Sequence, residues 1–317
     1  MKKSTLVAAA VLAAAGSAAS ADVYSFSFAV PNPITNTVSS FSIDTTGASG
    51  RARAFYVTGD WTAAGGDPWS NEFRVRLDGV TDVLGPLERI HGGVNNGSPF
   101  TFTDPTNTTW VNNVTNPVGY GYNTMLANAA SSDLGGMFTL GLRQSFAGSQ
   151  ASLANAQIHF LTDVIAPVAF DSAASGLSMP ARPTSLTTTT TGAGGGYTYD
   201  AMSFTPLVSG AHHLAMHISP PFDGYLLVYQ GAFDPNAPLV NLIGIDDIGG
   251  LGDPNSADMF LGLTAGQEYT LVATTFSAGS ALRVSGLFTI AGPVPAPGAV
   301  ALAGLAALGG LSRRRRN

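Results

Sequence analysis

The sequence predicts an all-β fold of two antiparallel β-sandwich domains, flanked by an N-terminal signal peptide and a C-terminal transmembrane helix. The first observation is length, since 317 residues are enough for about two domains. The second is composition: charged residues make up 11% of the chain, where about a quarter is usual, and 38 glycines and 19 prolines supply frequent turns. The third is pattern. Short stretches alternate apolar and polar residues, and no long window repeats apolar residues with the period of a helix.

The N-terminal end has the three parts of a secretory signal peptide. Lys2 and Lys3 precede an apolar run over residues 6–15, and Ala19-Ser20-Ala21 follows it. This order predicts export through the Sec translocon and cleavage by signal peptidase between Ala21 and Asp22. The alternatives are a membrane anchor or a buried helix, but the apolar run is too short to cross about 30 Å of hydrocarbon.

The C-terminal end also has three parts. Val294-Pro295-Ala296-Pro297 leads into an Ala/Leu-rich stretch over residues 299–311, and Arg313, Arg314, Arg315 and Arg316 follow it. Counted from Val294, the uncharged stretch is just long enough to span a membrane as a helix. The four arginines would remain on the cytoplasmic side as its anchor.

This tail, residues 294–317, resembles the PEP-CTERM sorting signal of Gram-negative bacteria, with Pro-Ala-Pro in place of Pro-Glu-Pro. The resemblance implies that an exosortase-like membrane peptidase recognises Val294, Pro295, Ala296 and Pro297 and removes the tail. It also implies a membrane-anchored intermediate in the inner membrane, followed by release to the outer surface or the extracellular space. The alternative is a plain membrane anchor that is never cut.

The charge of the exported part differs from that of the whole chain. Both lysines lie in the signal peptide and four arginines lie in the tail, which leaves eight arginines against twenty acidic residues, a formal charge of −12. Such a chain repels nucleic acid and anionic membranes. Without lysine it has no Schiff-base or Walker-lysine chemistry, and without cysteine it has no disulfide, thiolate metal site or cysteine nucleophile.

The first domain is predicted over residues 22–165. Phe73, Val75 and Leu77 alternate with two arginines, and Ile158 and Phe160 flank His159, as in half-buried strands. Residues 57–61 and 68–75 resemble the opening of jelly-roll-like modules found in other PEP-CTERM proteins. A Pro-containing stretch of small residues, 166–175, is predicted to be a linker.

The second domain is predicted over residues 176–291. Four blocks in order, 199–204, 222–235, 238–247 and 263–272, are similar to the bacterial pre-peptidase C-terminal (PPC-like) domain. The resemblance implies a β-sandwich that accompanies secreted proteins and has no catalytic role. The threonine run 187–191 is interpreted as a strand leading into a loop, and the alternative is a short O-glycosylated stalk.

Three groups of residues are candidate sites. His212, His213 and His217 could ligate a metal on a helix, but on a strand His213 and His217 lie about 13 Å apart and both point outward, opposite Leu214 and Met216.

Acidic residues of the Gly-rich loop at 244–258 could bind Ca²⁺, with Asp223, Asp246 and Asp247 as ligands, and the alternative is a polar turn. Exposed aromatic pairs, Trp61 with Trp69 and Tyr120 with Tyr122, could stack on sugars, although the tryptophans are better explained as core.

Catalytic motifs are missing from the sequence. It contains no G-x-S-x-G elbow, no P-loop and no convincing dinucleotide fingerprint. It has only three glutamates, Glu72, Glu88 and Glu268, and a sequence does not establish a carboxylate pair at the separation that glycosidases need. The sequence therefore predicts an exported, non-catalytic protein of the cell surface or extracellular matrix that acts by surface contact. The alternative is a calcium-dependent module that binds extracellular polysaccharide. A hydrolase is disfavoured, and nucleic acid is not an expected partner.

Overall fold

The stretches with a period of two form strands, and their side chains face the way the alternation predicts. The computed structural model describes residues 21–30, 32–82, 85–90, 96–103, 123–124, 133–192, 196–218, 223–247, 257–279 and 282–295. In β2 (Tyr24–Ser27) the aromatic rings are half-buried and the serines are exposed. In β10 (Gln150–Asp163) Ile158 and Phe160 are fully buried, whereas His159 between them is not. The pattern-based strand prediction is confirmed for these segments.

The protein is nearly all β in the part described, and every named strand pairing with a printed register is antiparallel. Within those ranges the helical content is a single 3-10 turn, η1 (Ser70–Glu72), and no helix has the length and apolar character needed to cross a membrane. Residues 1–20 of the predicted signal peptide, among them Ala19, and the predicted C-terminal helix with Ala296, Pro297 and Arg313–Arg316 lie outside the described residues. Ala21–Asp22 (β1) and Val294–Pro295 (β22) form a two-stranded pair.

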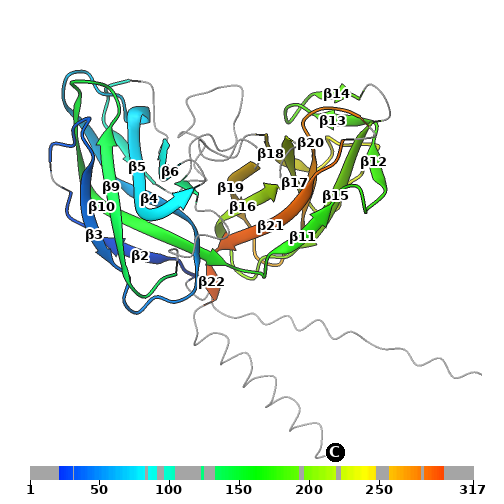
Figure 1. Ribbon diagram of the computed structural model, residues 1–317, viewed down its shortest axis with the longest axis horizontal. Helices are drawn as coiled ribbons and strands as arrows, with labels where there is room; N and C mark the ends of the chain where they lie inside the picture. Colours follow the sequence, from blue (N-terminus) through cyan, green and yellow to red (C-terminus); the bar gives the residue numbers. More distant parts are fainter. Residues whose placement is uncertain are drawn as a thin grey trace, which may run out of the picture. The chain divides into compact units, whose positions relative to one another are not determined.

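Two sheets enclose the core of the first half (Figure 1). One has four strands, in the order β3 (Ser39–Asp44), β9 (Met137–Gln144), β5 (Phe73–Asp82) and β6 (Gly85–Ile90). The other has nine strands and contributes here β10 and β2, already named, β4 (Ala52–Gly65), β7 (Phe100–Phe102) and β8 (Asn123–Thr124). Between them lies one core that contains Phe55, Trp61, Phe73, Leu140 and Phe160.

The nine-stranded sheet continues into the second half of the chain. Beyond β10 it contains β21 (Ser285–Gly292), β16 (Gly210–Ile218) and β19 (Ala257–Leu263), and β11 (Val168–Asp171) pairs with β21. The joint is short, since β10 and β21 pair at Thr162↔Gly292 and Asp163↔Ala291. Strand β11 lies inside the predicted linker 166–175. Residues Val23–Val294 form one compact unit, and the division into two domains stays a prediction.

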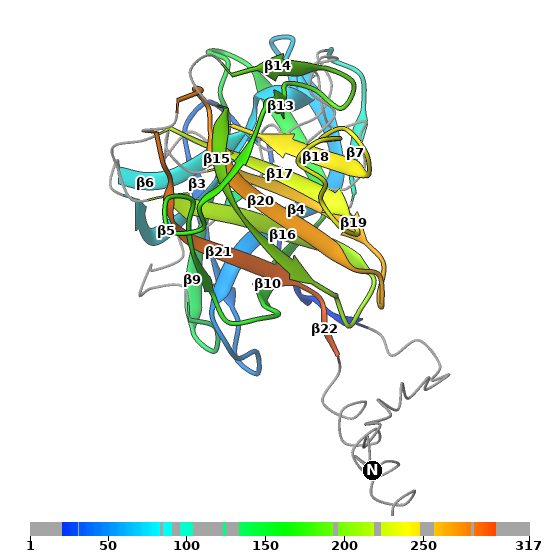
Figure 2. The same ribbon diagram turned by 90° about the vertical axis from the view of Figure 1, so that its right-hand side faces the viewer.

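A five-stranded sheet faces this second part of the nine-stranded sheet (Figure 2). Its order is β12 (Leu177–Met179), β15 (Tyr197–Phe204), β20 (Tyr269–Thr275), β17 (Gly224–Gln230) and β18 (Leu242–Asp246). Strands β17 and β20 are buried along nearly their whole length, so both faces of this sheet are covered.

The two faces of the five-stranded sheet have separate cores. The inner core is mainly aliphatic and lies against β16, β19 and β21, with Leu214, Leu226, Val228, Leu271 and Met259 among its members. The outer core contains the tyrosines Tyr197, Tyr199, Tyr225 and Tyr229 with Leu227 and Val272. A small hairpin of β13 (Ala181–Pro183) and β14 (Thr189–Thr191) and the loop that contains Phe233 and Leu239 contribute side chains to this outer core. Thr189–Thr191 of the threonine run thus form a strand.

Candidate functional site

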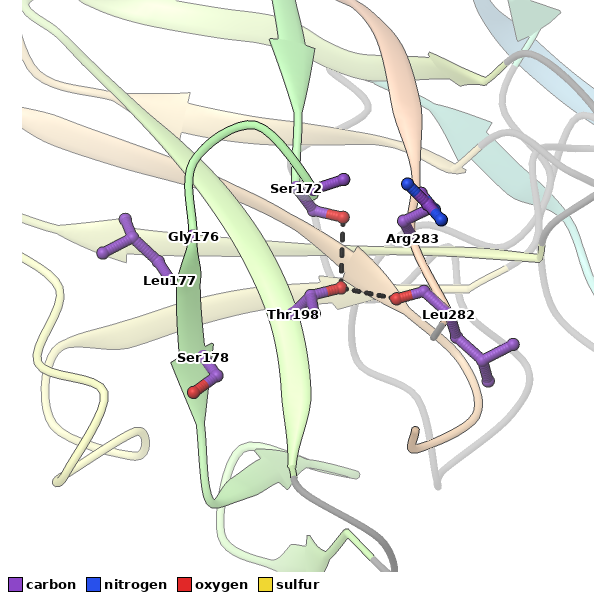
Figure 3. A pocket seen from close by; sticks show the side chains of 8 residues that line it. Ser172, Gly176, Leu177, Ser178, Thr198, Leu282 and Arg283 are labelled. Carbon is purple, nitrogen blue, oxygen red and sulfur yellow. Dashed lines mark hydrogen bonds between the residues drawn. The ribbon is translucent and has the colours of Figure 1, made fainter. Parts of the chain in front are cut away.

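A pocket lies where the segment after β11 turns into β12, the edge strand of the five-stranded sheet (Figure 3). The turn is held locally, because the Asp171 carboxylate accepts hydrogen bonds from the backbone N–H groups of Ala173 and Ala174 at 2.8 and 3.2 Å. Gly176 follows with a φ of 65°, a left-handed conformation that suits glycine. This turn redirects the chain and leaves Leu177 and Ser178 at the pocket wall.

A chain of hydroxyl groups crosses the pocket floor. The Val284 backbone N–H donates to Ser172 Oγ at 2.9 Å, and Thr198 Oγ1 donates to the Leu282 carbonyl at 2.7 Å. The two hydroxyl oxygens are 3.1 Å apart. Because Thr198 uses its own proton on the carbonyl, Ser172 must donate to Thr198. Figure 3 shows the two bonds that join Ser172, Thr198 and Leu282, and the second of them ties the Leu282 backbone to β15.

The pocket encloses about 370 Å³, near the small end of the 300–1,000 Å³ range of ligand sites. Its lining includes the hydroxylic residues Ser178 and Thr198, which lie opposite each other on neighbouring strands, and the cationic Arg283. Arg283 is exposed. The arrangement suits recognition of a small polar anion, and sequence reasoning missed it because its members come from three separate segments, 172–178, 198 and 282–283.

A second cluster surrounds the buried guanidinium of Arg182, on the hairpin strand β13. The guanidinium carbon lies 3.5 Å from the ring centre of Tyr225, 4.9 Å from that of Phe276 and 5.4 Å from that of Tyr197. Nε and Nη1 are buried without a hydrogen-bond partner. Aromatic faces compensate for part of the lost hydration of a cation. Burial raises the pKa of Tyr225 to about 12, against the opposing effect of the Arg182 charge.

Of the three predicted calcium ligands, Asp223 lies close enough to Asp247 and to Arg182 to interact electrostatically with both. Burial first, and then the charge of Asp247, raise the pKa of Asp223, while the Arg182 charge lowers it, so these groups share one electrostatic environment. Asp246 is buried, and its carboxylate accepts a hydrogen bond from the Asp258 backbone N–H at 2.8 Å. In the described part of the chain no group of three histidine, aspartate or glutamate side chains is placed to hold a metal ion. Asp253 lies outside the described residues.

The histidines lie on strand β16, and one expectation about them is wrong. His213 and Leu214 do face opposite sides, but His213 is 2% exposed and does not point into solvent. Its ring packs on Phe260 at 4.9 Å, and Nε2 is 2.9 Å from the Asp258 carboxylate. Phe260 belongs to the core of the first half, which therefore covers this face of β16. A period-two pattern cannot report that both faces are covered.

The other two histidines of this strand have separate partners. His212 is buried with Nδ1 at 3.0 Å from the Gly210 carbonyl, and burial lowers its pKa although that hydrogen bond opposes the shift. His217 Nε2 is 3.0 Å from Thr289 Oγ1. Each imidazole thus has a protein contact of its own, as expected for histidines on a buried strand.

The proposed tryptophan platform is not formed. Trp61 is fully buried in the core of the first half, as the core interpretation predicts, whereas Trp69 is 40% exposed. The Trp69 backbone is held by a reciprocal pair of bonds with Glu72: the Trp69 N–H donates to the Glu72 carboxylate, and the Glu72 N–H donates to the Trp69 carbonyl, both at 3.0 Å. Glu72 therefore has a structural role. Tyr120 and Tyr122 lie outside the described residues.

Comparisons with known proteins give no family for this chain. No protein-family model matches it, and no curated protein is similar to it. Among solved structures, dimeric latent PorU from Porphyromonas gingivalis matches at 14% identity with a TM-score of 0.21, covering 86% of this chain and 22% of PorU. The chain thus spans less than a quarter of the PorU chain.

Two further structures have similarly low scores. The tandem CBM22-1-CBM22-2 domains of Paenibacillus barcinonensis Xyn10C match at 12% identity and a TM-score of 0.24, covering 89% of this chain and all of the tandem. Tripeptidyl peptidase 2 matches at 13% identity and a TM-score of 0.21, covering 91% of this chain and 28% of the peptidase. Scores this low assign the chain to none of these folds.

Proposed function

We propose that this chain is an exported, non-catalytic protein of the cell surface or extracellular matrix that acts by surface contact. The observation that carries the proposal is the sequence arrangement: signal-like segments at both ends enclose a body without lysine or cysteine and with a formal charge of −12. Its expected processing partners are the Sec translocon with signal peptidase, and an exosortase-like membrane peptidase acting near Val294-Pro295-Ala296-Pro297.

The described part of the chain has the stability features that an extracellular protein needs. Its strands are stabilised by three extensive apolar cores, so it needs no disulfide for stability. In finer detail, we propose that the first half is a jelly-roll-like sandwich and the second a PPC-like sandwich, which would make the second half an accessory module. Acidic surfaces favour solubility and oppose adsorption to anionic membranes.

Cell fractionation with mass spectrometry of both ends tests the proposal. We expect the protein in the outer-surface or extracellular fraction, beginning at Asp22 and lacking the arginines Arg313–Arg316. Substituting Ala296 with Gln while leaving Pro295 and Pro297 in place is expected to leave export unchanged and to alter only the C-terminal processing. A cytoplasmic protein that retains Met1 and Asn317 would contradict the proposal.

The second candidate function is calcium-dependent binding of extracellular polysaccharide. It is favoured by the proximity of Asp223 and Asp247, whose mutual repulsion a divalent cation would relieve. The neighbouring Arg182 charge opposes cation binding. Calorimetric titration with Ca²⁺ of the wild type and of Asp247→Asn tests it; Asp246 is unsuitable because its carboxylate holds the Asp258 backbone. Absence of Ca²⁺ binding at millimolar concentration would rule this candidate out.

A further inference from the structure

Arg283 differs from Arg51, Arg53 and Arg182, three other arginines whose side chains the structure describes. Arg51 and Arg53 form ion pairs with Asp133 and Asp163, at 3.2 and 2.8 Å, and Arg182 is buried among aromatic rings. Arg283 is exposed, lines the pocket and has no acidic partner among the described residues. In a body with twenty acidic residues and eight arginines, an unpaired cation in a pocket is chemically unusual.

The carboxylates close to the pocket in sequence are already engaged. Asp171 accepts from the backbone N–H groups of Ala173 and Ala174, as described above. Asp200, two residues beyond Thr198, accepts from the backbone N–H of Asp171 at 2.9 Å and from that of Ala201 at 2.8 Å. Because these oxygens satisfy backbone donors, the guanidinium of Arg283 remains available to a ligand anion.

The hydroxyl groups of the pocket determine which further hydrogen bonds it can make to a ligand. Thr198 Oγ1 has given its proton to the Leu282 carbonyl and received one from Ser172, so it presents acceptor capacity. Ser178 has an exposed hydroxyl that can donate or accept. Together with Arg283, these hydroxyl groups give the pocket one cationic and two hydrogen-bonding groups.

We propose that this pocket binds a uronate, the carboxylated sugar ring of an acidic polysaccharide. The guanidinium of Arg283 binds the carboxylate, and Thr198 and Ser178, which lie opposite each other on one face of the sheet, bind ring hydroxyls. A volume of about 370 Å³ accommodates one or two sugar rings. The inference rests on the proposed function, because that function places the protein where extracellular polysaccharide occurs.

Binding measurements on the purified protein test this inference. The probes are a galacturonic acid trimer, a galactose trimer and sodium sulfate, titrated calorimetrically at about 0.15 M ionic strength so that the charge of the body is screened beyond about 8 Å. We expect saturable binding of the galacturonate trimer. Arg283→Gln should weaken it about ten- to hundredfold, as loss of a charged hydrogen bond does, and Arg283→Lys should weaken it less.

Arg51→Gln is the control, because it removes a half-buried arginine from the first half, away from the pocket, and it should leave binding unchanged. Equal binding of the galactose trimer would overturn the proposal, and so would unchanged binding in Arg283→Gln. Sulfate binding without galacturonate binding would show a simple anion site and would overturn it also. Since none of these measurements depends on cellular location, they fail or succeed independently of the fractionation experiment.

Discussion

The two faces of the five-stranded sheet show how differently one sheet can be covered. The inner face packs on β16, β19 and β21, whose positions are fixed by backbone hydrogen bonds within the nine-stranded sheet. The outer face is covered by side chains from a three-residue hairpin strand and a loop. The inner core is mainly aliphatic, whereas the outer core is built from tyrosines and encloses the Arg182 guanidinium.

The difference follows from what each cover can supply. A second sheet presents alternating apolar side chains over a wide area and so matches an aliphatic surface. Short segments such as the β13–β14 hairpin cannot present apolar side chains over a wide area, and they leave polar groups near the interface. Tyrosine suits such an interface because its ring is apolar and its hydroxyl can bond a backbone carbonyl, as Tyr229 does with Pro238 at 2.9 Å.

Neighbouring leucines on β17 offer the sharpest test of this comparison. Leu226 lies in the inner core and Leu227 in the outer core, and both are fully buried. We expect Leu226→Ala to lower the free energy of unfolding by about 4 kcal/mol and Leu227→Ala by about 2.5 kcal/mol, since the outer segments can move into the cavity and the sheet cannot. Urea unfolding measures both, and equal losses would show that the two covers are equally rigid.

Substitution of Arg182 separates packing from charge in the outer core. Arg182→Ala should cost about 2–3 kcal/mol, because it removes the aliphatic stem and the contacts with three rings. Arg182→Met should stay within about 1 kcal/mol of the wild type, because burying two unpartnered N–H groups costs about as much as the ring contacts return. A Met variant as unstable as the Ala variant would show that the charge itself is required.

Alkaline pH should destabilise the outer core selectively. Burial raises the pKa of Tyr225 to about 12 and raises that of Tyr229 further. Below pH 10 both tyrosines are protonated in the folded and unfolded states, and their contribution to stability is fully present. Between pH 10 and 12 the unfolded chain releases protons first, so stability falls as pH rises. Urea midpoints at pH 8 and 11 check this, and the fall should shrink in Tyr225→Phe but persist in Leu226→Ala.

The smallest expected effect concerns the bond between the outer face and its loop. Tyr229→Phe removes the hydroxyl that donates to the Pro238 carbonyl and should cost about 1 kcal/mol. Thermal unfolding at pH 7 measures it. A cost near that of Leu227→Ala would indicate that this bond, and not apolar contact, holds the loop on the sheet.

Sequence patterns predict the strands well where one face is covered and the other is open. In β2, for example, Tyr24 and Phe26 are half-buried, whereas Ser25 and Ser27 are exposed. Trp61 is fully buried, as its interpretation as a core residue predicts. The prediction fails for His213, where the pattern indicated an exposed face and Phe260 covers it. The pocket beside Arg283 could not be predicted either, since residues 172–178, Thr198 and Leu282 come together through pairing of strands distant in the chain.

By itself the sequence determined that this protein is built of short antiparallel strands and turns, and that its body is acidic and without lysine or cysteine. These properties are local or additive, so they can be obtained from residue types and their period. Only the tertiary structure decided which strands are covered on both faces. It also decided that one sheet contains strands from both halves of the chain, and that an arginine without an acidic partner lies beside a pocket. Those outcomes depend on which segments pair across long stretches of chain, and an alternating pattern distinguishes two faces of a strand without specifying what covers each.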